Sequence, residues 1–303
     1  MWTNACLKPW TTNQTVLKSI YGESKNTCTN NVDFGDRIET DKTIIAQRLN
    51  NYFVESIEDI CKSIPLVDFS EFLNQIPQAT TKFTLSEISN ESLLLYARET
   101  KDKKQNDNLT GKVILDALQN SIFRENLLEI FNKSITTCVI PKYFKISTVI
   151  PIPKVQSSIK CEDKRAINTL PVLNSILEKI VKNQIVDYFE DNNLLIDEQH
   201  GFRKNHSCET ALNIIINEWK KEVDSGKFII VVSIDFKRAF ETISRDLFLK
   251  KCQKYGFSDC ALKWFDNYLK TESRKPKWTI IHQTKSKISS ASPKGQSCHA
   301  FYL

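Results

Sequence analysis

The sequence predicts an α+β fold in which helices come first and a strand–helix core follows. Apolar residues recur at helical spacing through much of residues 41–140. The run 228–234 is almost continuously β-branched, and two further helical patterns come after it. Helices that precede a strand and its flanking helices, without regular alternation, are typical of the α+β class.

The composition is that of a globular protein with a mild basic excess. The 303 residues are 41% hydrophobic and 26% charged, which excludes a disordered chain, a collagen-like repeat and a coiled-coil rod. A net charge of +6 suggests a polyanionic partner. No apolar run approaches the roughly 20 residues of a membrane span, and the start shows no signal-peptide pattern. We therefore expect an intracellular protein without membrane contact. Its compartment, nucleus or cytoplasm, and its oligomeric state stay open.

The first half of the sequence predicts a loose leader and then helices. Residues 1–40 are rich in Asn, Thr and Ser and lack periodicity. Asp41 is a possible N-cap for a helix that ends before Pro65. A capping box from Thr84 to Glu87 predicts a second helix to about Arg98. A third helical region follows at about 113–131.

An extended segment then leads into the core. Residues 147–153 read Ser-Thr-Val-Ile-Pro-Ile-Pro, and the two prolines favour an edge strand or a β-ribbon arm. A long amphipathic helix is predicted after Pro171, ending near residues 192–193. Ser207 is a possible cap for the next helix, whose inner face would carry Ala211, Leu212, Ile215, Trp219 and Val223.

The last third predicts the central strand. Gly226 is a natural helix stop. Residues 228–234 predict a strand covered on both faces, because an apolar run without alternation is typical of such strands. Helices are predicted at about 244–255 and 259–270. A basic tail follows, with a short apolar stretch at 278–281.

Asp235 is the first candidate for chemistry. It directly follows the predicted strand, and a carboxylate at that position can bind a metal ion where the sheet meets solvent. The alternative is that it caps the following turn. Residues His200, His206 and Cys208 lie close together, but a solvated loop is favoured over a zinc site, because a fourth ligand is missing.

The residues around Asp235 resemble a known motif. The segment 234–243, Ile-Asp-Phe-Lys-Arg-Ala-Phe-Glu-Thr-Ile, resembles the first palm motif of reverse transcriptases of non-LTR (LINE-type, jockey-like) retrotransposons. Further segments match that family in the same order: 149–154, 162–167 (with Ala166 in place of proline), 170–181 and 198–212. The resemblance runs from about 147 to 303 and extends weakly back to 41–53.

The resemblance implies a domain plan and an activity. It implies the fingers region at 141–226 and a partial palm at 227–303 of a right-hand polymerase, after the leader 1–40 and a helical N-terminal extension at 41–140. It also implies RNA-directed DNA polymerase activity, in which two Mg²⁺ ions promote nucleotidyl transfer. The partners would be an RNA template, a DNA primer and deoxynucleoside triphosphates.

The resemblance also implies roles for individual residues. Asp235 would be the catalytic metal ligand, together with the backbone carbonyl of Phe236. The nucleotide would contact Lys154 and Arg165 from the fingers, Phe240 as an aromatic gate, and Lys294 and Gly295. Taken singly, the two cations suit solvated surface and Phe240 suits a core position. The following residues are candidates for nucleic-acid binding, a solvated face being the alternative: Lys142, Lys145, Arg203, Arg274, Lys275 and Lys277.

Two departures from the family bear on activity. The chain reads Pro293-Lys294-Gly295 where the family has Pro-Gln-Gly, and no aromatic-x-Asp-Asp occurs in the 303 residues. We therefore interpret the chain as truncated before the Asp-Asp hairpin and expect little or no polymerisation from it. The alternatives are a non-catalytic nucleic-acid-binding remnant and a transposon fragment without function.

Overall fold

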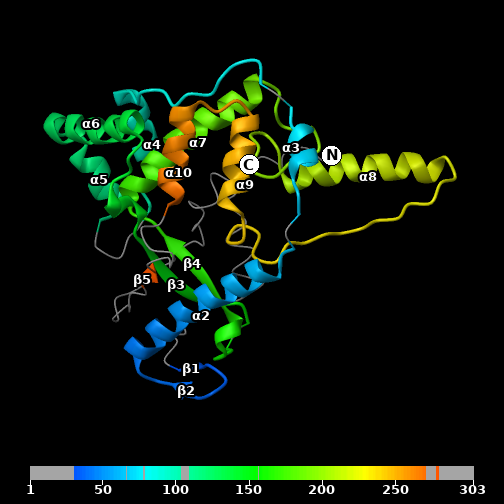
Figure 1. Cartoon of the computed structure of the whole chain (residues 1–303), viewed down its shortest axis with the longest axis horizontal. Coiled ribbons are helices and arrows are strands. Elements are labelled where there is room, and N and C mark those ends of the chain that lie inside the picture. The colour runs from blue at the N-terminus through cyan, green and yellow to red at the C-terminus, as the bar shows by residue number, and fades with distance from the viewer. Residues whose placement is uncertain are drawn as a thin grey trace, which may run out of the picture.

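The computed structural model describes residues 31–65, 67–77, 79–103, 109–155 and 157–270, and the backbone of 278–279. It mixes helices with small sheets, in agreement with the α+β class. A helical body forms one end of the molecule, and a β-ribbon extends from it toward a long helix, α2 (Figure 1). Within the described ranges, no helix is long and apolar enough to cross a bilayer.

The helical body is built around helix α7, Val172–Asp191, which supplies eleven buried residues. Around it pack α4 (Asn90–Glu99), α5 (Gly111–Ala117), α6 (Ser121–Thr137), the short 3₁₀ helix η1 (Lys142–Lys145), α9 (Arg245–Lys254) and α10 (Asp259–Leu269). Segments far apart in sequence thus share one apolar core, since α6 and α10 both contribute fully buried aromatic rings.

Side-chain caps set most helix starts, as the sequence predicts. Helix α2, Lys42–Ser63, begins after Asp41, whose carboxylate accepts from the amides of Thr43 and Ile44 at 2.8 and 3.0 Å. Helix α8, Cys208–Asp224, begins with a reciprocal capping box between Ser207 and Thr210. Such caps satisfy amides that have no partner within the helix.

The second predicted helix starts later than expected. The predicted capping box at Thr84 is wrong, because α4 begins at Asn90 with Ser89 as its cap. The intervening amides are used elsewhere: Ser86 N–H donates to Gln184 Oε1 at 2.9 Å and Ile88 N–H to Asn132 Oδ1 at 2.7 Å. Tertiary hydrogen bonds from α7 and α6 thus hold this segment extended. The third helical region is two helices, α5 and α6, capped by Thr110 and Asn120.

The ribbon consists of β3, Ser147–Pro153, paired antiparallel with β4, Lys164–Thr169, in a register from Thr148↔Thr169 to Pro153↔Lys164. The short 3₁₀ turn η2, Cys161–Asp163, precedes β4. Strand β5, Trp278–Thr279, pairs parallel with β3 only at Ser147 and Thr148. The predicted ribbon arm is therefore present beyond residue 148, whereas at its base β3 is the middle strand of three.

A small second core joins α2 to the ribbon. Strands β1 (Val32–Asp33) and β2 (Ile38–Glu39) form a hairpin beside α2, and α3 is a short helix at Ser70–Asn74. Val32 and Val149 are buried with three apolar residues of α2: Ile45, Leu49 and Phe53. The loose character predicted for residues 1–40 therefore does not extend to 31–40, while residues 1–30 lie outside the described ranges.

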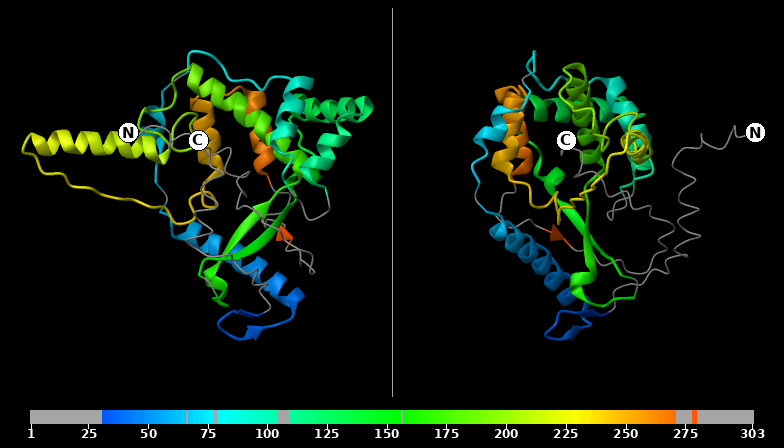
Figure 2. Two further views of the ribbon diagram at one scale, coloured as in Figure 1. Left: turned by 180° about the vertical axis from the view of Figure 1, so that it is seen from behind. Right: turned by 90° about the vertical axis from the view of Figure 1, so that its right-hand side faces the viewer.

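Residues 228–234 do not form the predicted buried strand. They are extended and exposed, with Phe228 100% and Ile230 90% accessible. A strand needs neighbours that complete its backbone hydrogen bonds, and no described strand pairs with this run. The predicted inner face of α8 is likewise uncovered: Leu212, Ile215, Trp219 and Val223 are between 38% and 57% exposed. Both α8 and the run after it project from the body (Figures 1 and 2).

This exposed run should make the protein self-associate. We expect the double variant Ile230→Lys, Val232→Lys to weaken concentration-dependent association in sedimentation velocity, because two charges interrupt an unpaired apolar edge. Its thermal midpoint should hardly move, since both side chains are largely exposed. The control is Ile122→Lys, Ile196→Lys, which adds the same charge at two separate exposed sites. Equal effects of the two pairs would contradict the expectation.

Candidate functional site

The candidate site is the loop that follows the exposed run and carries Asp235. The Asp235 and Phe236 side chains are exposed. Residues 237–242 form a tight turn in which the Arg238 carbonyl accepts from the amides of Glu241 and Thr242 at 3.0 and 3.2 Å. Arg238 adopts a left-handed φ of 51°. Because few non-glycine residues adopt this conformation, tertiary contacts must hold it.

Helix α2 supplies that contact. The Arg238 Nη1 donates to Ser56 Oγ at 2.7 Å, and its Nε lies 3.8 Å from Glu241 Oε2. The Arg238 and Glu241 side chains are only 20% and 29% exposed. The loop after Asp235 is therefore fixed to a helix nearly two hundred residues earlier in the chain. No sequence pattern marked Ser56, since a serine in a helix has no distinctive spacing.

The ribbon brings Lys154 toward the same loop. Burial raises the pKa of Glu241, while the positive charges of Arg238 and Lys154 oppose that rise. Lys154 Nζ also donates to the Glu162 carbonyl at 3.1 Å. Of the two predicted finger cations, Lys154 thus lies near the Asp235 loop, and Arg165 is exposed on β4 opposite Ile152.

Phe240 is half-buried and packs edge-on against Phe202, with ring centroids 6.1 Å apart. The block around residue 200 and the Asp235 loop are therefore in contact. His200 and His206, in the same block, bond to Thr210 Oγ1 and the Lys204 carbonyl, both at 2.9 Å. These partners agree with the solvated-loop interpretation of the two histidines.

The predicted nucleic-acid-binding residues fall into three groups. Lys142 is exposed on η1. Lys145 and Arg203 have structural partners: Lys145 Nζ donates to the Asn267 carbonyl at 2.6 Å, near the end of α10, and Arg203 pairs with Glu190 at 3.2 Å. A cation at a helix C-terminus stabilises the last carbonyl groups. The third group lies outside the described residues: Arg274, Lys275 and Lys277. The nucleotide-binding candidates Lys294 and Gly295 also lie outside them.

The described residues do not by themselves make a Mg²⁺ centre. Two-metal sites need several oxygen ligands arranged around both ions. Asp235 and the Phe236 carbonyl offer two oxygen donors, and no three His, Cys, Asp or Glu side chains of the described ranges come together as a metal site. We therefore assign no step of chemistry to a metal ion.

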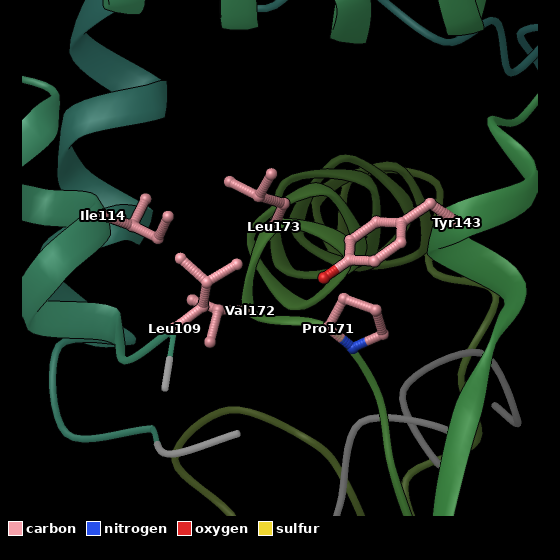
Figure 3. A pocket seen from close by; sticks show the side chains of 6 residues that line it. All are labelled: Leu109, Ile114, Tyr143, Pro171, Val172 and Leu173. Atoms are coloured by element: carbon pink, nitrogen blue, oxygen red, sulfur yellow. The ribbon is translucent and has the colours of Figure 1, made fainter. Parts of the chain in front are cut away.

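A small pocket lies away from this loop, where α5, η1 and the start of α7 meet (Figure 3). The side chains that line it leave no room for even a water-sized molecule, whereas typical ligand sites measure roughly 300–1,000 Å³. Its lining includes no charged side chain: Leu109, Ile114, Tyr143, Pro171, Val172 and Leu173. A triphosphate would find no cationic partner there.

One family match covers both strand β4 of the ribbon and the Asp235 loop. Residues 152–294 match the family described as reverse transcriptase (RNA-dependent DNA polymerase). This part of the chain, just under half of its length, is similar to the reverse transcriptase family. The match spans Lys154, Arg165, Asp235 and Phe240, so the four residues lie within one reverse transcriptase segment.

Two curated relatives are similar to part of this chain. A probable RNA-directed DNA polymerase from transposon BS of Drosophila melanogaster is 25% identical over 126 residues, 41% of this chain and 14% of that protein. A putative COX1/OXI3 intron 1 protein of Saccharomyces cerevisiae is 29% identical over 124 residues, 40% of this chain and 13% of that protein. The chain thus matches only a small part of the length of both relatives.

The Ser56–Arg238 contact gives a direct test of how this loop is held. We expect Ser56→Ala to speed amide exchange at Glu241 and Thr242 by about 2–10-fold, because a net hydrogen bond is worth roughly 0.5–1.5 kcal/mol. Hydrogen–deuterium exchange measured by mass spectrometry reports this region. The control is Ser63→Ala, which removes a hydroxyl at the exposed end of the same helix. Unchanged exchange in Ser56→Ala would show that the turn holds itself.

Proposed function

We infer that this chain contributes fingers and part of the palm to a mobile-element RNA-directed DNA polymerase, with Asp235 as one carboxylate of its nucleotidyl-transfer site. The family match supports the activity class. The non-LTR subtype, the boundaries at 40, 140 and 226, and the roles of single residues are parts of this proposal. The substrates would be deoxynucleoside triphosphates, with an RNA template and a DNA primer.

One observation carries the proposal: Lys154 of the ribbon lies near Glu241 of the Asp235 loop. Lys154 thereby brings a positive charge to the loop that carries the exposed Asp235 carboxylate. Lys154 and Arg165 would attract the triphosphate, and Arg can bind two of its oxygens at once. Phe240, held by Phe202, would present its ring beside the sugar.

Photo-cross-linking tests the nucleotide site in the full 303-residue chain. A photoreactive deoxynucleoside triphosphate should label peptides that contain Lys154, Arg165 or residues 235–240, and unlabelled nucleotide should compete. Lys154→Ala should reduce labelling several-fold, whereas Lys220→Ala, at an exposed lysine on α8, should not. Labelling that ignores both substitutions would contradict the proposed site.

Primer extension on an RNA template with Mg²⁺ tests activity itself. We expect little or no synthesis, because the 303 residues contain no aromatic-x-Asp-Asp and the described residues offer an incomplete ligand set. Robust synthesis that is lost in Asp235→Asn would overturn this expectation of inactivity.

A second candidate function is non-catalytic nucleic-acid binding, which the basic excess favours. Residues 142–165 hold six Lys and Arg against two acidic residues, and 270–294 hold seven against one. Such binding should weaken steeply with salt and be indifferent to Asp235→Asn. The third interpretation, a fragment without function, predicts broad thermal unfolding, whereas the shared core of seven helical elements favours a cooperative transition.

A further inference from the structure

Two cysteines far apart in sequence meet where α6 ends and α10 begins. The Cys138 and Cys260 sulfur atoms lie 3.2 Å apart, although 122 positions separate the residues. Each sulfur atom also lies near a backbone carbonyl of the other helix. Cys138 Sγ is 3.3 Å from the carbonyl oxygen of Cys260 in α10, and Cys260 Sγ is 3.9 Å from that of Ile135 in α6. Two sulfur atoms at this separation need move only about 1 Å to reach the roughly 2.05 Å of a disulfide bond.

The surrounding backbone keeps the thiols together. Cys138 is the C-cap of α6 in the left-handed conformation, with φ 57°. Cys260 lies in the first turn of α10, after the Ser258 cap. Trp264 of α10 donates to Ser134 of α6 at 3.3 Å, one turn into the core. The two helix ends are therefore packed in place before any bond forms.

The two thiols differ in their access to solvent. Cys260 is exposed and Cys138 is half-buried. Burial, and then the hydrogen bond and the charge of Cys260, raise the pKa of Cys138 to about 11. The exposed Cys260 thiol is the one that an external oxidant reaches first. The thiolate is the attacking form of a cysteine, and Cys138 forms little of it. The short distance between the two sulfur atoms compensates for this low thiolate fraction.

We propose that Cys138 and Cys260 are a redox modification site that closes to an intramolecular disulfide by exchange with a small disulfide such as oxidised glutathione. The Cys260 thiolate attacks one glutathione sulfur and releases one glutathione thiolate, leaving a mixed disulfide. The Cys138 thiolate then attacks the Cys260 sulfur and releases the second glutathione. The protein loses two protons and two electrons, and one oxidised glutathione becomes two reduced molecules.

The consequence is a covalent link across the helical body. The bond would join α6 to α10 and close a loop of more than 100 residues, which restricts the unfolded chain strongly. We expect the thermal midpoint of the oxidised protein to rise by about 5–10 °C over the reduced protein. Cys138→Ser should abolish that rise.

Peptide mapping after treatment with oxidised glutathione tests the site. In the wild-type chain we expect a Cys138–Cys260 cross-linked peptide as the main intramolecular product. In Cys138→Ser we expect glutathione to remain on Cys260. In Cys260→Ser we expect modification of Cys138 to fall at least about fivefold, because the exposed attacking thiol is gone.

Cys208 provides an internal control within the same sample. It is exposed at the first residue of α8, and no described thiol is recorded beside it. Its glutathione adduct should therefore persist in the wild-type chain, while the adduct on Cys260 is replaced by the cross-link. Persistent glutathione on wild-type Cys260, or cross-links spread evenly among the cysteines, would overturn the proposal.

Discussion

Replacing Glu178 by Gln is expected to remove most of the dependence of folding stability on pH between about pH 5 and pH 8. Glu178 lies on α7 inside the helical core and is 1% exposed. Burial raises the pKa of its carboxyl group to about 8, against the opposing effects of Tyr268, Lys103 and Asn174. At neutral pH the folded protein therefore keeps this carboxyl group largely protonated.

The unsatisfied oxygen of Glu178 favours a neutral carboxyl group, against the hydrogen bonds of Tyr268 and Asn174, which favour the ionised form. Glu178 Oε1 accepts from the Tyr268 hydroxyl, whereas its Oε2 and the Asn174 Oδ1 are both buried with no donor among the described residues. The Asn174 side chain lies within hydrogen-bonding reach of Glu178. A proton on Glu178 Oε2 could be donated to Asn174 Oδ1 in a hydrogen bond. This bond would remove the penalty of leaving both oxygens unsatisfied.

The sign of the effect follows from proton counting. Between pH 4.5 and about pH 8 the folded protein holds a proton on Glu178 that the unfolded chain has released. The stabilisation is complete below pH 4.5 and is lost as pH rises toward 8, so the free energy of unfolding falls by up to ~1.4 kcal/mol per pH unit from this group. Gln cannot ionise and should be more stable than the wild type above pH 8.

Urea unfolding at half-unit steps from pH 5 to pH 9 measures this difference. The slope of the free energy of unfolding against pH is compared between the wild type and Glu178→Gln, and the difference is the contribution of Glu178. Glu129→Gln is the control, because Glu129 forms an exposed ion pair with Lys133 on α6 and should leave the slope unchanged. A wild-type slope that survives in Glu178→Gln would show that Glu178 is ionised in the folded protein.

Replacing Trp264 by Ala is expected to destabilise the protein by about 3–5 kcal/mol, because it removes a large buried ring and leaves a cavity. Trp264 is fully buried. Its ring stacks on Tyr268 at 5.4 Å with an interplanar angle of 6° and meets Phe265 edge-on at 5.1 Å. Its indole N–H also donates to Ser134 Oγ, which joins α10 to α6.

Trp219 offers a matched control for this substitution. It also lies on a helix, α8, but it is 39% exposed, and no described element covers the apolar face of that helix. Trp219→Ala should change the free energy of unfolding by less than about 1 kcal/mol. Equal losses for the two variants in urea unfolding would mean that α8 is packed in solution against something that covers its apolar face.

Local signals predicted the helices well where a side chain decides the start. Asp41 and Ser207 accept hydrogen bonds from amides two or three residues later in the chain. The signal for such a helix start is therefore local in the sequence. The start of α4 could not be predicted in this way. Its upstream amides bond to Asn132 and Gln184, whose positions depend on the tertiary fold.

The run 228–234 shows the limit of apolar patterning. Six of its seven positions are β-branched or aromatic and predict burial, but a strand also requires a neighbour, and the sequence of the run does not specify one. Lys145 shows the same limit for charge. Its position in a basic stretch suggested nucleic acid, and only the fold places it against the end of α10.

The site was predictable by motif and less so by geometry. The Asp235 segment was recognised from its letters, and the family match supports it. The Ser56 anchor and the Cys138–Cys260 pair arise from contacts across more than 100 residues. Glu178 carried a weak signal, since it occupies the apolar stripe of α7 beside Leu177 and Val181.

The two prolines of β3 limit how far its sheet can widen. The Lys154 amide donates toward β4, to the Asp163 carbonyl at 2.7 Å, so Pro151 and Pro153, at odd positions along the strand, face the opposite edge. That edge lacks amide donors beyond Val149, and within the described residues β5 pairs with β3 at Ser147 and Thr148. A further strand could therefore not continue a regular hydrogen-bond ladder along this edge toward the tip, which protects the edge against fibril-like stacking.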